Sequence, residues 1–277
     1  ACRTSIEFIE DSPPMVSIAV DRQADPGLAP AEQEQFQRDG FLILRGFADA
    51  DTVARLRAVA EEHLRHEIAP LEYEADLHYP GAPPSRSAEG GRTVRRLLQA
   101  QGRHPAFTHW LSQPALRIRL HQLLGPEVLM PLAHHNCIMT KQPRFSSDTG
   151  WHQDIRYWNF QRPELINVWL ALGPERERNG CLRIVPGSHR LALDRARFDA
   201  ALFFREDLPD NQALLAQAVC AELDAGDVLL FHARALHAAS RNFSEQTKFS
   251  AVFTFRPGDN RPVPGTRSAS LPELLLP

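Results

Sequence analysis

Six short runs rich in β-forming residues fill the second half of the chain, and they restrict its possible folds more than any other feature. Gly, Pro and Asn separate these runs, which are Val128–Thr140, Ile166–Leu172, Cys181–Val185, Val228–Phe231, Leu236–Ser240 and Lys248–Arg256. Many short strands with turn residues between them are typical of a β-sandwich or a barrel. We therefore predict a single double-sheet barrel for this half of the chain.

The first half is predicted to be mainly helical. One helix begins at Pro30, with acidic residues in its first turn, and ends at Gly40. A second helix, capped by Asp51 or Thr52, repeats apolar residues at helical spacing, and a third helical region covers about 105–124. The chain thus has helices first and strands afterwards.

These elements predict one domain over residues 30–277, preceded by a flexible lead-in over 1–29 that is rich in Pro, Asp and Ser. The helical part of the domain covers 30–125. Within it, residues 70–93 contain several Pro and Gly residues and show no periodicity. Long loops of this kind in compact domains often serve as lids or binding loops, and we predict such a loop here.

Composition and charge favour a globular enzyme that acts on a small molecule. The net charge of -3 gives no general attraction to nucleic acid or to a membrane surface. No apolar stretch approaches the roughly 20 residues that span a bilayer. The 4 cysteines are widely spaced and form no CxxC pair, so they are interpreted as reduced thiols and the protein as cytoplasmic.

A histidine and a carboxylate stand two residues apart in the segment 150–154, Gly-Trp-His-Gln-Asp. On an extended strand His152 and Asp154 project to the same face, because side chains alternate. A second imidazole would complete the two-histidine, one-carboxylate ligand set of non-haem Fe(II) oxygenases, which leaves positions open for a co-substrate and O₂. Such a pair alone is commonly a surface feature, but the aromatic residues around it favour a metal site.

His237 is the preferred third ligand. It begins a stretch of small residues, 238–240, that leaves space above a metal ion for substrate and O₂. The main competitor is His232, which ends an apolar run and reads as a strand-end or core histidine.

Three further histidines are weighed against this choice. His134 and His135 are adjacent in the sequence, so on a strand they point to opposite faces and one of them could enter the cavity. The more common outcome for each is a half-buried polar neighbour. His189 follows a tight turn and is interpreted as structural.

An iron of this type usually requires a bidentate oxo acid as electron source, and the far carboxylate of that acid requires a buried cation. Lys248 is the cation closest to His237 in sequence on the following strand. The residues predicted to share its face are Lys248, Ser250, Val252, Thr254 and Arg256. Arg256 is the competing cation, and a strand-end lysine in solvent is the alternative for Lys248. Trp169 is either simple core or a wall of the co-substrate pocket.

Arginines near the metal motif suggest an anionic substrate. Arg86, Arg92, Arg95 and Arg96 cluster beside the long loop, and Arg156 follows the metal motif closely. Guanidinium groups bind carboxylates, phosphonates and phosphates well, although solvated surface arginines are the alternative for each. A small acidic metabolite or an amino-acid derivative is the predicted substrate, with an acyl-CoA second.

Five ordered segments carry a resemblance to a known family. They are Phe36–Gly46, Trp151–Tyr157, Asn179–Arg190, Gly226–His232 and Leu236–Asn242. With these segments the chain resembles, over most of residues 30–257, the phytanoyl-CoA dioxygenase (PhyH) family of Fe(II)/2-oxoglutarate dioxygenases.

The resemblance implies a mainly β fold with flanking helices, built on a double-stranded β-helix (jelly-roll, cupin-like) core over about 126–257. It implies iron held by His152, Asp154 and His237. It also implies that Trp169 and the strand from Cys137 to Lys141 lie beside 2-oxoglutarate.

Two departures from the family affect the co-substrate site. The family commonly has an arginine where this chain has Lys248, and often a hydroxyl-bearing residue where Ala239 stands. Asp154 also carries information, because related halogenases have a small residue there that makes room for chloride. Hydroxylation is therefore expected rather than halogenation.

The resulting hypothesis is an Fe(II)- and 2-oxoglutarate-dependent dioxygenase that uses O₂ to hydroxylate a small, anionic organic molecule. The alternative from another class is a non-catalytic jelly-roll binding or sensor protein with a vestigial metal site. A zinc hydrolase that uses the same ligands is a third option.

Overall fold

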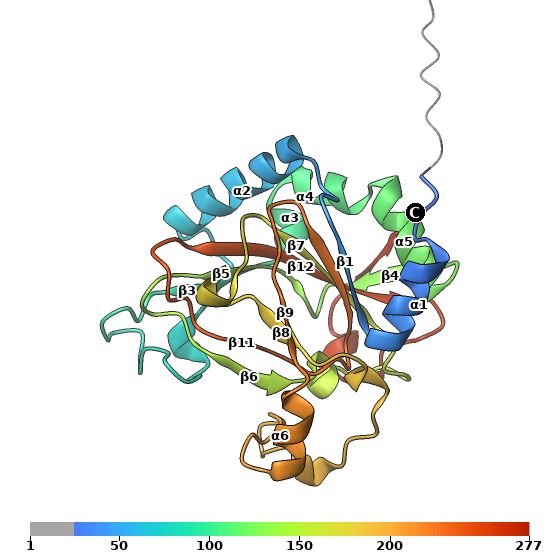
Figure 1. Cartoon of the computed structure of the whole chain (residues 1–277). Helices are drawn as coiled ribbons and strands as arrows, with labels where there is room; N and C mark the ends of the chain where they lie inside the picture. The colour runs from blue at the N-terminus through green and yellow to red at the C-terminus, as the bar shows by residue number, and fades with distance from the viewer. Residues whose placement is uncertain (1–24, 277) are drawn as a thin grey trace, which may run out of the picture.

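The computed structural model describes residues 25–276, which form two antiparallel β-sheets with helices packed mainly against the larger sheet (Figure 1). Residues 1–24 and 277 lie outside the described part, and with them most of the predicted lead-in over 1–29. Among residues 25–276, none of the helices combines the length and the apolar character that a bilayer-spanning helix requires.

Within the described residues the larger sheet has nine strands. Its main path runs β1 (Phe41–Leu44), β10 (Val228–His232), β7 (Ile166–Ala171), β12 (Lys248–Pro257), β5 (Asn136–Lys141), β3 (Val94–Leu98) and β2 (Leu71–Tyr73). Two more strands branch from this path: β4 (Val128–Pro131) pairs with β12, and β13 (Glu273–Leu276) pairs with β4. The long strand β12 lies near the centre and holds β5 and β7 on its two sides.

The smaller sheet has four strands in the described part of the chain. Their order is β6 (Thr149–His152), β11 (His237–Ala239), β8 (Leu182–Ile184) and β9 (Val219–Ala221). A cluster of buried side chains from both sheets fills the space between them, and it includes Trp169, Leu182 and Phe231. The predicted double-sheet arrangement is therefore present.

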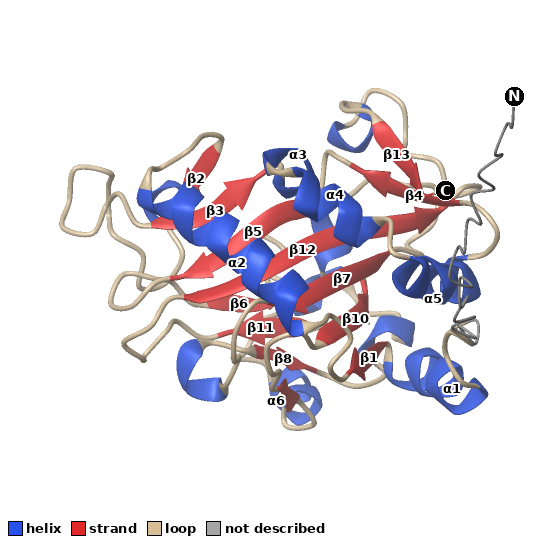
Figure 2. Cartoon of the chain, turned by 90° about the horizontal axis from the view of Figure 1, so that it is seen from above, coloured by secondary structure: helices blue, strands red, loops and turns tan. Residues whose placement is uncertain are grey.

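Helices cover the outer face of the larger sheet, as Figure 2 shows for α2 and α4. The helices that precede β6, the first strand of the smaller sheet along the chain, are α1 (Pro30–Asp39), α2 (Ala50–Arg65), α3 (Ala100–Arg103), α4 (Pro105–Leu111) and α5 (Pro114–Leu124). Their apolar residues share one buried cluster with the outward side chains of the sheet. A further helix, α6 (Pro209–Leu215), lies on the other side of the molecule, beside the smaller sheet (Figure 1).

The side chains of β12 point alternately into two buried clusters, one beneath the helices and one between the sheets. Phe249, Phe253 and Phe255 belong to the cluster beneath the helices, whereas Val252 belongs to the cluster between the sheets. Because successive side chains on a strand point to opposite faces, Lys248 lies on the same side as Val252. The predicted division of this strand into an apolar face and a polar face is thus confirmed.

The predicted end of the first helix is also confirmed. Gly40 follows α1 with φ +79°, a left-handed conformation that glycine adopts without strain. A Cβ atom at this position would lie 2.2 Å from Nδ1 of His189. Glycine is therefore required both by the backbone turn and by the packing of a neighbouring ring.

Several predicted boundaries were wrong. The segment 70–93 is not structureless, because it contains β2 and a 3₁₀ turn, Glu74–Asp76. The second helix is capped by Asp49, whose carboxylate accepts the Thr52 backbone N–H at 2.7 Å. The region 105–124 is two helices, since Pro114 begins a new one after a break.

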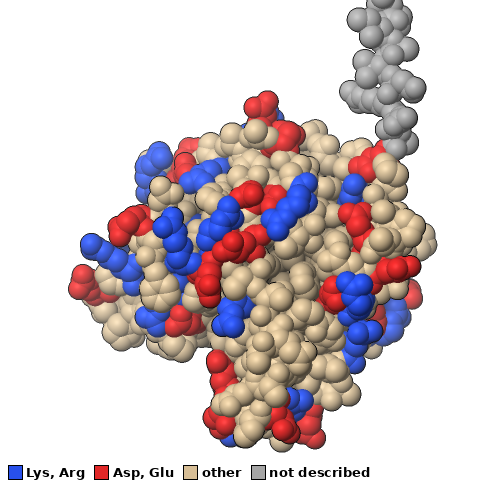
Figure 3. Space-filling view, viewed as in Figure 1, with Lys and Arg blue, Asp and Glu red and all other residues tan. Residues whose placement is uncertain are grey.

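Two further differences concern the β-rich half. The run 128–140 is divided into β4 and β5 by a turn, and α6 was not predicted. On the face drawn in Figure 3, Lys and Arg are interspersed with Asp and Glu, as the small net charge suggests.

Removal of a large side chain from the core beneath the helices should test the packing. Phe253 is 0% exposed and contacts Trp110 with ring centroids 5.9 Å apart. We expect Phe253→Ala to lower the free energy of unfolding by about 3–5 kcal/mol, because it leaves a cavity. Urea denaturation followed by fluorescence measures this change. The control is Phe243→Ala at a side chain that is 70% exposed, and an equal loss in both variants would contradict the assigned core.

Candidate functional site

The pairing of two strands in the smaller sheet brings two histidines together. His152 is the last residue of β6 and His237 is the first residue of β11, and the two are direct partners in the antiparallel register. Their ring centroids are 4.2 Å apart, and both side chains are buried. Two histidines 85 positions apart in the sequence thus lie side by side in the structure.

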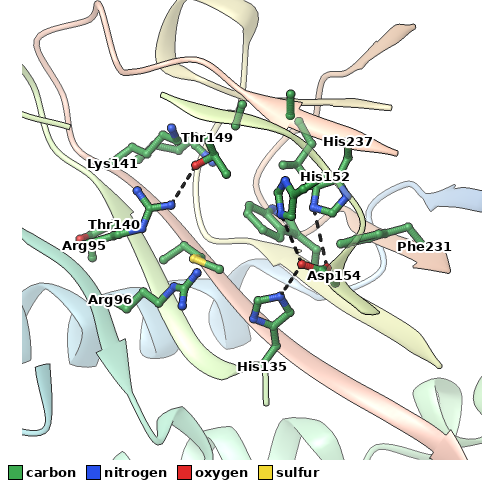
Figure 4. Close-up of a pocket in the computed structure, with 16 residues that line it drawn as sticks. Arg95, Arg96, His135, Thr140, Lys141, Thr149, His152, Asp154, Phe231 and His237 are labelled. Atoms are coloured by element: carbon green, nitrogen blue, oxygen red, sulfur yellow. Dashed lines mark hydrogen bonds and ion pairs between the residues drawn. The ribbon is translucent and has the colours of Figure 1, made fainter. Parts of the chain in front are cut away.

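Asp154 joins this pair by a route different from the predicted one. Strand β6 ends at His152, Gln153 is still extended with φ −110° and ψ 133°, and Asp154 begins a 3₁₀ turn, Asp154–Tyr157. Its carboxylate lies 3.5 Å from Nε2 of His152 and 3.7 Å from Nε2 of His237. One ligand atom from each of His152, Asp154 and His237 lies within 4.8 Å of the others (Figure 4). These three residues, called the metal group below, could hold a metal ion.

Both imidazoles are prepared for metal binding by their own backbone. Nδ1 of His152 lies 2.8 Å from the Gly150 carbonyl oxygen, and Nδ1 of His237 lies 3.0 Å from the Ala235 carbonyl oxygen. A carbonyl can only accept, so Nδ1 carries the proton and the Nε2 lone pair faces Asp154. Burial, with the neighbouring His237, lowers the pKa of His152 to about 3, and burial also lowers the pKa of His237. The neutral imidazoles fit a divalent metal.

Two side chains hold the Asp154 carboxylate. His135 Nε2 lies 3.2 Å from Oδ1, and the Asn167 amide donates to Oδ2 at 2.8 Å. Thr254 in turn donates to the Asn167 oxygen at 2.6 Å. Burial by itself raises the pKa of Asp154, but the charge of His135 and the hydrogen bond from its imidazole hold that pKa well below its usual value. Asp154 is therefore an anion in a buried site, which is the state that a metal ligand requires.

The remaining histidines have other partners. His232 Nδ1 accepts the Arg234 backbone N–H at 3.0 Å, and its ring lies against His189 with centroids 5.2 Å apart. His134 binds the Ser268 hydroxyl at 2.8 Å. His135 faces the metal group, although the half-buried neighbour was the favoured interpretation of it. Its pKa rises to about 9, because the charge of Asp154 and the hydrogen bond to it outweigh burial.

An inner cavity of about 60 Å³ lies on one side of the metal group. Its lining includes Trp169, Lys141, Lys248 and the small side chain of Ala239. Lys141 donates to the carbonyl oxygens of Ser147 and Ser240 at 3.0 and 2.5 Å. Burial, followed by the charges of Arg95 and Lys248, lowers the pKa of Lys141 to about 7. Trp169 and Lys141 are among the residues that the resemblance placed beside the co-substrate, and Lys248 is the cation preferred for the far carboxylate.

Arg256, the competing cation on β12, lies outside the inner cavity. Arg256 forms an ion pair with Glu273 and donates to the Pro257 carbonyl oxygen at 2.9 Å, and it does not line the inner cavity. Lys248 does line it, so the solvent-exposed alternative for Lys248 is wrong. Cys137 is buried between the sheets and borders a second cavity rather than the inner one.

This outer cavity has a volume of about 280 Å³. It shares five lining residues with the inner cavity, namely Arg96, His135, Thr149, His152 and Asp154. Its other walls include the aromatic side chains of Tyr79, Tyr157 and Trp158. The metal group therefore lies where the two cavities meet.

The predicted substrate arginines divide between the cavities and the surface. Arg156 lines the outer cavity, donates to the Tyr79 hydroxyl at 3.2 Å and lies over the Phe203 ring. Arg96 borders both cavities, and Figure 4 shows its guanidinium between Arg95 and His135. Arg95 borders the inner cavity but is held by Glu74 at 3.0 Å and by two hydroxyls.

Arg86, one of the predicted substrate-binding arginines, lies away from both cavities. It is exposed, forms an ion pair with Asp76 at 2.7 Å and lines neither cavity. Arg92 is likewise exposed and paired with Glu67. Arg267 was not predicted, but it lines the outer cavity. It comes from a turn near the C-terminal end of the described residues, which no motif marks.

Comparison with known proteins identifies the family. Residues 36–250 match the family model described as Phytanoyl-CoA dioxygenase (PhyH). The chain belongs to the phytanoyl-CoA dioxygenase family. The ectoine dioxygenase of Halomonas elongata is 26% identical over 87% of this chain and 74% of its own length. The peroxisomal phytanoyl-CoA dioxygenase of Mus musculus is 25% identical over 79% of this chain and 65% of its own length.

Solved structures share the fold of this chain. EctD from S. alaskensis, crystallised with 2-oxoglutarate and 5-hydroxyectoine, has a TM-score of 0.71 and 20% identity, and the match covers 85% of this chain and 78% of EctD. The epimerase SnoN, in complex with Fe3+, alpha ketoglutarate and nogalamycin RO, has a TM-score of 0.69 and 22% identity over 87% of this chain and 89% of its own. The predicted jelly-roll, cupin-like fold is confirmed.

Membership of the phytanoyl-CoA dioxygenase family also gives the class of enzyme. The chain is an Fe(II)- and 2-oxoglutarate-dependent dioxygenase. The histidine–aspartate–histidine group agrees with this class, because neutral imidazoles and a carboxylate with open positions around the metal suit non-haem iron.

A half-buried histidine outside the metal group, His232, should make the stability of the protein depend on pH. Burial, with the charges of His189 and Arg234, lowers the pKa of His232 to about 3, whereas an unfolded histidine titrates near about 6.5. Between these values the unfolded state binds more protons, so stability is full above about pH 6.5 and falls as the pH drops, by at most about 1.4 kcal/mol per pH unit.

Urea denaturation of the protein in EDTA at pH 6 and pH 5 measures this dependence. We expect His232→Gln to reduce the loss of stability over that interval by about 1 kcal/mol. The exposed His66 provides the control variant His66→Gln. An identical pH dependence in wild type and His232→Gln would contradict a neutral His232 in the folded state.

Proposed function

We propose that this dioxygenase hydroxylates a small organic anion and that His152, Asp154 and His237 hold its iron. The observation that carries the proposal is the buried group of three ligand side chains, whose ligand atoms lie within 4.8 Å of one another where two cavities meet. The inner cavity, with Lys141, Trp169 and Lys248, is assigned to 2-oxoglutarate. The outer cavity is assigned to the substrate.

Bound iron would supply the oxidation in which substrate C–H, O₂ and 2-oxoglutarate give substrate C–OH, succinate and CO₂. The chain's own residues fix the geometry for this chemistry. His135 and Asn167 orient the Asp154 carboxylate, and two backbone carbonyls orient the imidazoles. On the side of the inner cavity, the buried side chains of Trp169, Leu182 and Phe231 exclude water from the reacting atoms.

The outer cavity supports an anionic substrate of modest size. Arg156 has hydrogen bonds to a hydroxyl and a carbonyl only, at 3.2 and 3.5 Å, so within residues 25–276 its charge meets no carboxylate within 4 Å. Arg267 adds positive charge to the same walls, whereas the charge of Arg96 is compensated by Glu72 at 3.4 Å. A carboxylate or phosphate would find charged donors there and an aromatic wall beside them. Ectoine, phytanoyl-CoA and nogalamycin appear in the names of relatives, and a carboxylate or an amino-acid derivative fits this cavity best.

The assigned iron ligands should be necessary for activity and for the co-substrate complex. We expect His237→Ala and Asp154→Ala to abolish succinate formation, because two ligands cannot fix the metal geometry. Anaerobic addition of Fe(II) and 2-oxoglutarate should give a visible charge-transfer band in wild type that both variants lack. The control is His232→Ala, at a half-buried histidine outside the three-residue group, which should keep the band; a band in His237→Ala would refute the assigned ligand set.

The assigned substrate arginine should affect substrate binding more than turnover. We expect Arg156→Met to raise the KM of an acidic substrate about 10- to 100-fold, since a charged hydrogen bond contributes about 1.5–3 kcal/mol. Substrate-dependent succinate formation provides both kcat and KM. Arg86→Met is the matched control on the surface, and equal KM values in Arg156→Met and wild type would remove Arg156 from the substrate site.

A further inference from the structure

The cation of the inner cavity already has a carboxylate partner inside the protein. Lys248 Nζ lies 2.8 Å from Oε2 of Glu175, and the two side chains are 2% and 0% exposed. The other oxygen of Glu175 accepts the Ser250 hydroxyl at 2.6 Å and the Trp169 indole N–H at 2.8 Å. Three donors therefore converge on one buried carboxylate, and the charge of Lys248 is compensated.

The backbone holds Glu175 in this position. Its N–H donates to the Leu223 carbonyl oxygen at 2.8 Å, and the Leu223 N–H donates back to the Glu175 carbonyl oxygen at 3.0 Å. Departure of the side chain would leave a buried ammonium and an indole N–H without this acceptor, which is costly in a dry interior. The pair is therefore a fixed part of the cavity wall.

The cations around the inner cavity differ in whether a carboxylate compensates their charge. Arg95 and Arg96 have the acidic partners Glu74 and Glu72, at 3.0 and 3.4 Å. Lys141, the direct partner of Lys248 across the β5–β12 pairing, binds only carbonyl oxygens. Among the described residues that line the cavity, Lys141 is the cation without a carboxylate within 4 Å. Lys248, the cation expected to receive a far carboxylate, is not available as a full charge.

We propose that Glu175 determines the selectivity for the co-substrate, because it occupies Lys248, Ser250 and Trp169 as a built-in carboxylate. This inference rests on the proposed function of the inner cavity. The far carboxylate of 2-oxoglutarate meets the compensated pair of Lys248 and Glu175. Lys141 is already held by two backbone carbonyl oxygens, and burial lowers its pKa to about 7. Neither cation therefore offers this carboxylate a full charge, so it adds little to binding. The metal and the 1-carboxylate and 2-oxo group hold the co-substrate instead, and a 2-oxo acid with an uncharged tail binds about as well.

The test compares two five-carbon acids, 2-oxoglutarate and 2-oxopentanoate, which differ in the far carboxylate. Isothermal titration of the full chain loaded with Mn(II), without O₂, gives the Kd of each acid without turnover. In wild type the two Kd values should agree within about fivefold. In Glu175→Gln the Kd of 2-oxoglutarate should fall about tenfold or more, the effect of freeing one charged donor. The Kd of 2-oxopentanoate should change by less than about twofold.

Glu177→Gln is the matched control, since Glu177 is exposed and only two residues away; both Kd values should equal those of wild type. A wild-type preference for 2-oxoglutarate above about fivefold overturns the inference, as does an unchanged or weaker 2-oxoglutarate Kd in Glu175→Gln. The wild-type comparison decides the question even if that variant does not fold. Failure of both acids to bind the Mn(II) protein would instead overturn the proposed function, and the inference with it.

Discussion

The antiparallel pairing of β11 with β6 is the contact on which the site depends. It places His237 directly opposite His152, and the 3₁₀ turn after β6 then returns Asp154 to the same point. A shift of one residue in this register would turn His237 to the other face of the sheet. The larger sheet and its helices support this pairing, because the core between the sheets sets where the small sheet lies.

Much of the architecture could be predicted from short-range patterns. The β-rich runs, the helix that ends at Gly40 and the two faces of β12 all follow from local periodicity or backbone conformation. The choice of His237 over His232 used the small residues after it, and Ala239 indeed borders the inner cavity. Boundaries were less predictable, because Pro114 interrupts a helical pattern that continues on both sides of it.

The residues that hydrogen-bond to Asp154 and to Lys248 could not be predicted from local sequence patterns. Asn167 and Thr254 form a hydrogen-bonded chain to Asp154 from two different strands, and Glu175 reaches Lys248 from a segment 73 residues away. Each of these contacts depends on the pairing of distant strands. A weak signal was present for Asn167, a polar residue in a fully buried apolar strand. Nothing local distinguished Arg86 on the surface from Arg96 in the cavity.

The proposed metal ligands are held in two different ways. A backbone carbonyl oxygen two residues before each histidine orients both imidazoles. The side chains of His135 and Asn167, from other segments of the chain, orient the carboxylate. Exchange of a neighbouring side chain can therefore tilt the carboxylate without disturbing either ring. Substitutions around Asp154 therefore offer a way to change the outcome of the reaction through one ligand while the imidazole pair keeps its position.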